Sequence, residues 1–315
     1  MPTSTTHKSF SFLLISDIHE RQSNLDHIRP DLLKQADYVV CLGDVCNLDN
    51  GGLQPDDKTT HNPLHESELD VDQSMLSTLR DARTQCDQLQ ERFVPQSKDS
   101  SDKSAARFYW IPGNHDTYLD YLPEKTSSSH NKIVDIDSRL FMAFFGGAVP
   151  GYRQKDGVQE WDGYPYKSDA ELLQSMTDLR EKVEYKLKEH SDKQVILFTH
   201  CGPSESQTTL FWKDTNSDII TSGSQSMSEW LKTKEMQRQC VANLHGHTHP
   251  ATGKAHIAKV PVINVGSIRE GRYAYMDVIF DEKDDKYKVG CLQLFEFHVE
   301  DPYGMQQKTA KKKEM

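Results

Sequence analysis

Five apolar segments that each end in metal-binding residue types constrain this chain more than any other feature. The segments have the length of β-strands and lie at 12–16, 38–42, 108–112, 195–199 and 241–245. The residues that follow them are Asp17-Ile18-His19, Gly43-Asp44, Gly113-Asn114-His115-Asp116, His200 and Gly246-His247-Thr248-His249. Parallel strands of an open sheet bring their carboxyl ends to one edge, where ligand sites form. A single Asp-x-His motif more often consists of ordinary polar surface residues than of metal ligands. Five such groups at five strand ends predict one shared site.

The segments between these strands have the periodicity of amphipathic helices, which together with the strands predicts an α/β protein. Residues 24–36 indicate a helix that is interrupted at Pro30. Ser168-Asp169-Ala170-Glu171 matches a capping box, and Ser226-Met227-Ser228-Glu229 predicts the start of a shorter helix in the same way. The last third is rich in strands, and its alternating pattern predicts a sheet with one face in solvent.

The composition limits the class of protein. The chain has 315 residues, of which 36% are hydrophobic, and these suffice for a sizeable core. The net charge is −11, so the chain lacks the excess of basic residues that is typical of a protein that binds extended nucleic acid. The six cysteines form no CxxC motif, which favours a reducing compartment. No apolar run reaches the length of a membrane span, so we expect a cytoplasmic protein without a membrane partner.

We predict one domain over residues 1–300, with a partly helical insertion at 49–106 and a basic, disordered tail at 301–315. Within the insertion, apolar residues recur at helical spacing from Leu69 to Phe93. This pattern favours a helix packed on the core over a face that binds a partner. Attraction of the tail to phosphate or to a membrane is the minor alternative.

The polar groups at the strand ends have the composition of a metal site. Besides His115 and Asp116 they supply two aspartates, one asparagine and four histidines. This mixture suits Mn, Fe, Zn or Co, and it contains too much nitrogen for Ca or Mg alone. Seven ligands exceed the needs of one tetrahedral ion and suit two ions that share a carboxylate, about 3.5–4 Å apart. Each group has a plainer interpretation when taken alone, such as a turn at Gly43-Asp44 or a core histidine at His200.

These five groups resemble, in order, the signature blocks of the calcineurin-like metallophosphoesterases, over residues 12 to about 250. Gly266-Ser267 and the segment from Arg269 to Tyr273 are also similar to the part that follows the last block in many members. The resemblance implies a two-sheet β-sandwich flanked by helices, with four layers in the order αββα. It implies hydrolysis of phosphoesters by a hydroxide that bridges two divalent metal ions.

The resemblance also implies a role for each residue of the blocks. The ligands of the first metal would be Asp17, His19 and His249, and those of the second Asn114, His200 and His247. Asp44 would bridge both ions. His115 would protonate the leaving oxygen, while Asp116 orients His115 and raises its basicity. The metals expected are Mn, Fe, Zn or Co, and nothing in the sequence selects among them.

The chain departs from the Ser/Thr protein phosphatases of this superfamily, which have a Gly-Asp-x-x-Asp-Arg-Gly block. Here the corresponding stretch is Gly43-Asp44-Val45-Cys46-Asn47-Leu48, which lacks the arginine and has Asn47 in place of an aspartate. The missing arginine removes a bidentate phosphate clamp. We therefore predict a small, nucleotide-like phosphodiester or phosphomonoester as substrate. A protein phosphatase and a non-catalytic scaffold are the alternatives, although a scaffold should have lost ligands.

Candidates for substrate contact are fewer and weaker. Phe211 and Trp212 follow the His200 block and would either stack a nucleobase or pack a loop onto the body. Arg153 and Arg269 are candidates for binding a phosphate oxygen. Tyr152, Trp161 and Tyr164 lie in the same region as Arg153 and are candidates for the mouth of the site. No pattern identifies a protein partner.

Overall fold

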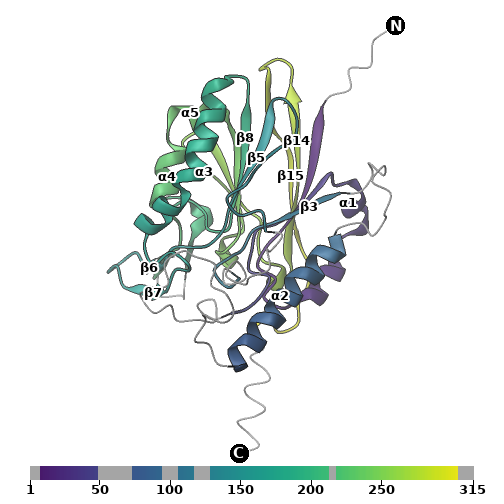
Figure 1. The fold of residues 1–315 in the computed structure, drawn as a ribbon, viewed down its shortest axis with the longest axis vertical. Coiled ribbons are helices and arrows are strands. Elements are labelled where there is room, and N and C mark those ends of the chain that lie inside the picture. The colour runs from purple at the N-terminus through teal and green to yellow at the C-terminus, as the bar shows by residue number, and fades with distance from the viewer. Residues whose placement is uncertain (1–7, 49–72, 94–105, 117–127, 213–217, 304–315) are drawn as a thin grey trace, which may run out of the picture.

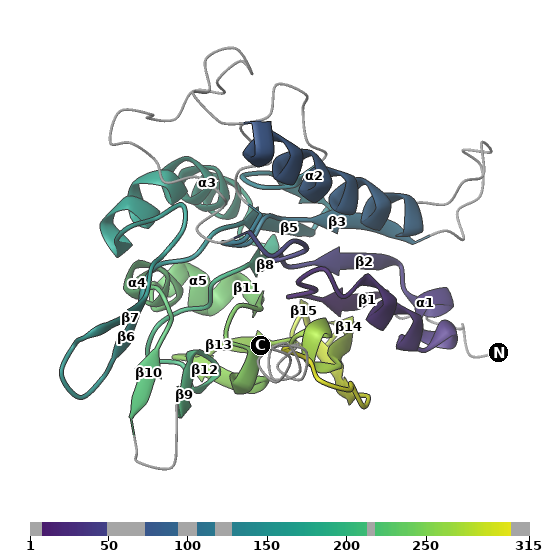
Figure 2. The same cartoon turned by 90° about the horizontal axis from the view of Figure 1, so that it is seen from below.

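The computed structural model describes residues 8–48, 73–93, 106–116, 128–212 and 218–303. Two β-sheets stack face to face, and helices cover the outer face of each, as Figures 1 and 2 show. A large apolar cluster fills the space between the sheets, and two further clusters lie between each sheet and its helices. The predicted αββα sandwich is therefore confirmed.

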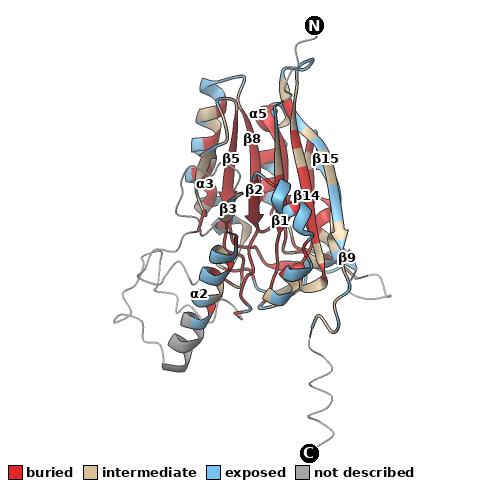
Figure 3. Ribbon diagram, turned by 90° about the vertical axis from the view of Figure 1, so that its right-hand side faces the viewer, coloured by how far each residue is buried: buried red, intermediate tan, exposed pale blue. Residues whose placement is uncertain are grey.

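The first sheet has five strands in the order β15-β14-β1-β2-β3. Their bounds are β1 (Ser9–Ile15), β2 (Tyr38–Cys41), β3 (Arg107–Trp110), β14 (Arg272–Asp281) and β15 (Lys286–Glu296). The strands β1, β2 and β3 run parallel, while β14 and β15 are antiparallel. Exposed and intermediate positions recur along β15, as expected for a strand with one face in solvent (Figure 3).

The second sheet has six strands in the order β12-β13-β11-β8-β5-β4. Their bounds are β4 (Ile133–Asp135), β5 (Leu140–Phe145), β8 (Gln194–Thr199), β11 (Cys240–His245), β12 (Gly253–Ile257) and β13 (Val260–Asn264). The four central strands are parallel, and the two edge strands are antiparallel. Every residue of β5, β8 and β11 is buried, because each strand is covered by the other sheet on one face and by helices on the other.

Helices of the two outer layers begin where local chemistry favours them. The 3₁₀-helix η1 (Gln22–His27) ends before Pro30, where α1 (Pro30–Gln35) begins, so the interruption predicted at Pro30 is confirmed. On the other side, α3 (Asp169–Glu189) is capped by Ser168, whose hydroxyl accepts from the Glu171 amide at 3.3 Å. The helices α4 (Gln225–Leu231) and α5 (Lys234–Gln239) complete this layer.

The predicted start of α4 was two residues too late. Ser224 caps this helix by accepting from the Met227 amide at 3.1 Å. The hydroxyl of Ser226, the predicted cap, donates instead to the carboxylate of Asp169. A contact with a distant helix thus takes Ser226 away from the role that the local pattern indicated.

The helix α2 (Gln73–Phe93) lies within the predicted insertion and packs on the five-stranded sheet. Cys86, Leu89 and Phe93 are buried, and Phe93 stacks on Phe108 with ring centroids 5.4 Å apart. The core-facing prediction is confirmed for these three side chains, while Leu69 lies outside the described residues. The thiol of Cys46 donates to the Ala82 carbonyl at 3.2 Å, so α2 also supports the loop that follows Asp44.

A third, four-stranded sheet lies at the lower end of the molecule in Figure 1, and the sequence did not predict it. Its strand order is β7-β6-β10-β9, with bounds β6 (Gly151–Arg153), β7 (Gln159–Trp161), β9 (Leu210–Trp212) and β10 (Ile219–Thr221). Strands of three residues are too short to leave a recognisable alternation in the sequence.

The division into a domain at 1–300 and a tail stays a prediction, but residues 301–303 do contact the body. The Asp301 carbonyl accepts from Arg21 at 3.4 Å, and the Pro302 carbonyl accepts from Arg269 at 2.8 Å. The Tyr303 hydroxyl donates to Glu270. Residues 304–315 lie outside the described part of the chain. In the described ranges, no helix is long and apolar enough to span a bilayer.

Two neighbouring leucines of α3 test how the outer helix layer contributes to stability. Leu172 is fully buried, whereas 38% of Leu173 is exposed. We expect Leu172→Ala to lower the free energy of unfolding by about 2–5 kcal/mol, because it leaves a cavity in the core. Leu173→Ala should change it by less than about 0.5 kcal/mol. Urea denaturation of both variants measures the difference, and equal losses would contradict the packing of α3.

Candidate metal centre

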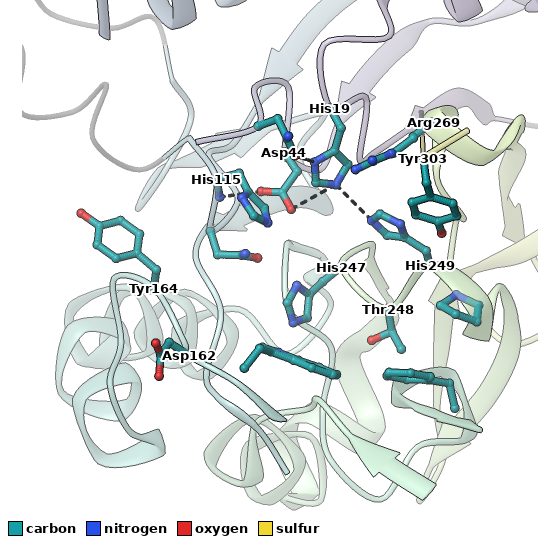
Figure 4. A pocket seen from close by; sticks show the side chains of 15 residues that line it. His19, Asp44, His115, Asp162, Tyr164, His247, Thr248, His249, Arg269 and Tyr303 are labelled. Carbon is teal, nitrogen blue, oxygen red and sulfur yellow. Dashed lines mark hydrogen bonds and ion pairs between the residues drawn. The ribbon is translucent and has the colours of Figure 1, made fainter. Parts of the chain in front are cut away.

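The predicted ligands meet where the carboxyl ends of five strands from the two stacked sheets come together. Figure 4 shows four of them, His19, Asp44, His247 and His249, around one pocket. β1 leads to Asp17 and His19, and β2 leads to Asp44. Asn114 follows β3, His200 follows β8, and His247 and His249 follow β11. All of these strands are parallel within their sheets, which is why residues so distant in sequence share one edge.

One ligand group consists of Asp17, His19 and His249. Their possible ligand atoms all lie within 4.8 Å of one another. The Nε2 atom of His249 is 3.0 Å from Asp17 Oδ1 and 3.1 Å from His19 Nε2. Two imidazole nitrogens that face each other this closely, beside a carboxylate, have the arrangement of donors around a shared cation.

The second ligand group consists of Asp44, His200 and His247, again with their ligand atoms within 4.8 Å. Asn114 Oδ1 lies 2.9 Å from His200 Nε2 and joins this group. Asp44 Oδ2 is 3.3 Å from His200 Nε2 and 3.7 Å from His19 Nε2. Asp44 therefore contacts both groups, which is the position a bridging carboxylate requires.

A buried atom without a partner tests whether metal ions fit this site. His247 Nε2 is inaccessible to solvent and has no hydrogen-bond partner in the described part of the chain. Buried polar atoms in proteins are nearly always paired, so an orphan of this kind points to an absent ligand. A cation beside Asp44 and His200 would take the lone pair of that nitrogen, and the donor set therefore fits a divalent metal.

Contacts on the far side of the imidazoles hold their orientation. His19 Nδ1 donates to Asn47 Oδ1 at 3.0 Å, and His200 Nδ1 donates to the Leu42 carbonyl at 2.7 Å. Glu270 Oε1 lies 3.5 Å from His249 Nδ1. A proton fixed on Nδ1 leaves the Nε2 lone pair for a metal. Asn47, which departs from the protein phosphatase pattern, thus still positions a ligand through its amide oxygen.

The electrostatics of the site demand positive charge. Burial raises the pKa of Asp44, but the charges of His200 and His115 outweigh it, so the pKa lies well below its ordinary value. Burial lowers the pKa of His200, yet the charge of Asp44 raises it to about 9. In the same way, burial lowers the pKa of His249 and Asp17 raises it to about 10. Without a metal, protons on these histidines supply the charge that a divalent cation would replace.

The backbone around the ligands is strained. Asp17, His19, Asp44 and His247 all have φ between 47° and 64°, in the left-handed region that side chains with a Cβ atom disfavour. Each such residue costs about 1–3 kcal/mol and persists only where the surroundings enforce it. A Cβ atom on Gly113 would overlap the carboxylate of Asp44, so only glycine lets β3 approach the bridge this closely.

The structure corrects the role predicted for Asp116. Its carboxylate accepts from the amides of Val45, Cys46 and Gly113 at 2.7–3.1 Å. His115 Nδ1 lies 2.7 Å from the Leu48 carbonyl, so Leu48 and not Asp116 orients this ring. The side chain of Asp116 turns back under the loop after β2 because three amides there need an acceptor. Burial and the charge of Asp44 raise the pKa of Asp116 to about 6.

Five residues of the ligand groups line a pocket of about 370 Å³, namely His19, Asp44, Asn114, His247 and His249. Of the predicted substrate contacts, Arg269 and Phe211 line it, as do Trp161 and Tyr164 from the same predicted region. Trp212 does not line the pocket, and 64% of its surface is exposed.

Arg153 and Tyr152 also lie outside the pocket lining. Arg153 forms ion pairs with Glu160 at 2.8 Å and with Asp156 at 3.4 Å, which hold its side chain on the small sheet. Substrate binding by Arg153 stays a prediction, and in this structure its charge is paired with neighbouring carboxylates outside the pocket lining.

Glu270 and Tyr303 are among the residues of the site that were not predicted from the sequence. Glu270 contacts the ligand His249, and Tyr303 lines the pocket and donates to Glu270. Glu270 lies in the segment from Arg269 to Tyr273 that resembles the family, and this resemblance could have identified it as a site residue. Tyr303 lies at the start of a basic tail, and its aromatic ring gave no periodic or spatial clue to this position.

The chain is similar to known proteins in sequence and in fold. The family model described as calcineurin-like phosphoesterase matches residues 10–251. One crystal structure is 16% identical with a TM-score of 0.52, covering 92% of this chain and 100% of its own, and it supports the fold. The structure of TT1561 of Thermus thermophilus is 14% identical, with a TM-score of 0.42, and the match covers 90% of this chain and 99% of that one. The structure of the calcineurin-like phosphoesterase YfkN from Bacillus subtilis is 12% identical, with a TM-score of 0.38, and the match covers 98% of each chain. No curated protein matches the chain.

Replacement of the shared carboxylate tests the arrangement of the two groups. We expect Asp44→Asn to lower the occupancy of both metal positions and nearly abolish turnover, because it removes charge from both. Metal content by plasma mass spectrometry after dialysis measures the effect. Asp162→Asn, a pocket residue outside both groups, is the matched control. A dialysed Asp44→Asn protein with full metal content would exclude the bridging role.

Proposed function

The chain belongs to the calcineurin-like phosphoesterase family, whose members hydrolyse phosphoester bonds, and on that premise we propose a substrate and a metal centre for it. The substrate is a small, nucleotide-like phosphodiester or phosphomonoester, and the residues beside it would hold two divalent metal ions. The observation that carries this proposal is the pair of ligand groups that Asp44 joins, since its carboxylate lies near His19 of one group and His200 of the other and lines the pocket.

The metals expected are Mn, Fe, Zn or Co, since the donors are imidazole nitrogens and carboxylate or amide oxygens. Asp17, His19 and His249 would hold one ion, and Asn114, His200 and His247 the other, with Asp44 shared. When bound, two such ions supply Lewis acidity that activates water and neutralises the charge of a phosphoryl group. The neutral oxygen of Asn114 limits the negative charge where the phosphate must bind.

His115 is placed to handle the proton of the leaving group. Its ring borders the pocket, and its possible ligand atom lies within 4.8 Å of those of His19 and Asp44. Because Nδ1–H of His115 donates a hydrogen bond to the Leu48 carbonyl, Nε2 is the nitrogen left for the substrate. In the imidazolium form, this Nε2 donates a proton to the departing oxygen.

Arg269 supports binding of the phosphate from the side of the pocket. Its guanidinium group stacks over the Tyr303 ring at 4.7 Å, and its Nε donates to the Pro302 carbonyl. These contacts occupy one face of the guanidinium group and its Nε–H donor. The remaining N–H donors of Arg269 are left for a phosphate oxygen. Arg269 thereby offers part of the charge that the missing arginine of the protein phosphatase block would have given.

The small size of the pocket favours a small molecule over a phosphoprotein. A cavity of about 370 Å³ is at the low end of those that bind small ligands. The scaffold alternative is opposed by the seven converging ligands and by the placement of His115. A cytoplasmic location stays a prediction, supported by six cysteines that are all free.

The test compares a diester with a monoester. Metal-free protein is loaded with Mn, Fe, Zn or Co and assayed with bis-p-nitrophenyl phosphate, p-nitrophenyl phosphate and a phosphoserine peptide. Faster cleavage of the diester supports a phosphodiesterase, and faster cleavage of the monoester supports a phosphomonoesterase. Preference for the peptide would favour the protein phosphatase alternative. Metal binding without turnover of any substrate would favour the scaffold.

Substitution of His115 tests the proton donor. We expect His115→Ala to keep both metals but to slow esters with poor leaving groups most, by about 10²–10⁴-fold, since these need protonation. Rates for aryl esters of graded leaving-group acidity measure this dependence. His256→Ala, an exposed residue of β12, is the control. Equal losses for good and poor leaving groups would contradict a role in proton donation.

A further inference from the structure

Two aromatic rings of the small four-stranded sheet form a surface inside the pocket, which we call the aromatic shelf. It consists of Trp161 at the end of β7 and Phe211 in β9. The ring centroids are 5.5 Å apart and the planes differ by 19°, so the rings are nearly parallel and offset. Both side chains line the pocket and neither is buried, so aromatic surface is open to a ligand.

The shelf depends on a glycine in β6, one of the two strands that lie between its rings. β7 and β9 are opposite edges of the small sheet, and β6 and β10 lie between them. Gly151 of β6 pairs with Trp161, and a Cβ atom at Gly151 would overlap the indole ring. The indole therefore lies across β6 to reach Phe211 because residue 151 has no side chain.

The shelf adjoins the second ligand group. The Trp161 ring meets His247 edge to face, with centroids 6.3 Å apart. His247 in turn meets His200 in the same manner, with centroids 5.1 Å apart. A phosphoester held over Asp44, His200 and His247 would therefore place one of its substituents directly beside the shelf.

The chemistry of the pocket wall selects the kind of substituent. Two offset rings bind a flat π-system by stacking, and every nucleobase has such a face. Among the described lining residues, Arg269 is the single lysine or arginine, which suits one phosphate group better than a polyphosphate chain. The carboxylate of Asp162 lies next to Trp161 at the pocket wall and disfavours a second anionic group there.

We propose that the aromatic shelf of Trp161 and Phe211 binds a nucleobase, so that the substrates are nucleoside phosphoesters with the base stacked beside His247. The proposal rests on the proposed phosphoesterase function of the same pocket. It assigns the small sheet a role in substrate selection that is separate from the metal-binding strand ends.

Two diesters with a common leaving group isolate recognition of the nucleoside. These are the p-nitrophenyl ester of thymidine 5′-monophosphate and methyl p-nitrophenyl phosphate. We expect the wild-type protein to have the higher kcat/KM for the thymidine ester. Trp161→Leu and Phe211→Leu should each lower the ratio of the two kcat/KM values by about tenfold or more, the usual effect of losing a stacking ring. Trp161→Phe should recover part of the ratio.

Trp212→Leu is the matched control, since Trp212 lies next to Phe211 in β9 but points to solvent. It should keep the wild-type ratio. Gly151→Ala gives a second route to the same result, because the new methyl group displaces the indole without removing it. Thermal denaturation accompanies each variant, and a ratio that is unchanged in folded Trp161→Leu, Phe211→Leu and Gly151→Ala would overturn the proposal.

A binding measurement separates failure of the shelf from failure of the phosphoesterase function. Adenosine 5′-monophosphate is titrated by calorimetry into metal-loaded wild-type protein and the same variants. If no ester is cleaved but this probe binds the wild type and is lost with Trp161→Leu, the shelf holds and the proposed activity fails. If both esters are cleaved at similar rates by all variants and the probe binds none or all of them equally, the activity holds and the shelf is overturned.

Discussion

The contacts of one buried carboxylate, that of Asp44, organise the rest of the site. Its oxygens contact His200 of one ligand group, His19 of the other and the amide of His115 at 2.8 Å. A charge buried this deeply is tolerated only if it is paired and hydrogen-bonded. The paired sheets supply these three partners from the ends of β8, β1 and β3, so the sandwich architecture provides the pairing that the buried charge of Asp44 requires.

The arrangement is costly for the fold, which indicates that it is kept for function. Four ligand residues have left-handed backbone, and buried histidines lie beside carboxylates and beside each other. The stacked strands that precede these loops are almost entirely apolar and buried, and they carry the stability that offsets this strain. A site that needed only stability would have been filled with apolar side chains.

The sequence predicted the features that depend on local pattern or on strand ends. The cap at Ser168 and the interruption at Pro30 follow from short-range chemistry and were confirmed. The αββα layers, which the resemblance to the family implied, were confirmed as well. The errors have a common cause, since distant contacts decided them. Ser226 bonds to Asp169, and the carboxylate of Asp116 accepts from backbone amides. Strands of three residues and a tail residue such as Tyr303 left no pattern to detect.

The two parts of the pocket differ in how freely they can change. The ligand groups are built from strand ends in the core, where Gly113 and strained backbone permit few substitutions. The aromatic shelf belongs to a small sheet outside both stacked sheets, and its geometry depends mainly on Gly151 and on two partly exposed rings. Substitutions there alter one wall of the pocket without replacing a ligand residue. Chemistry and substrate choice are thus carried by separate elements, which is how one fold serves many substrates.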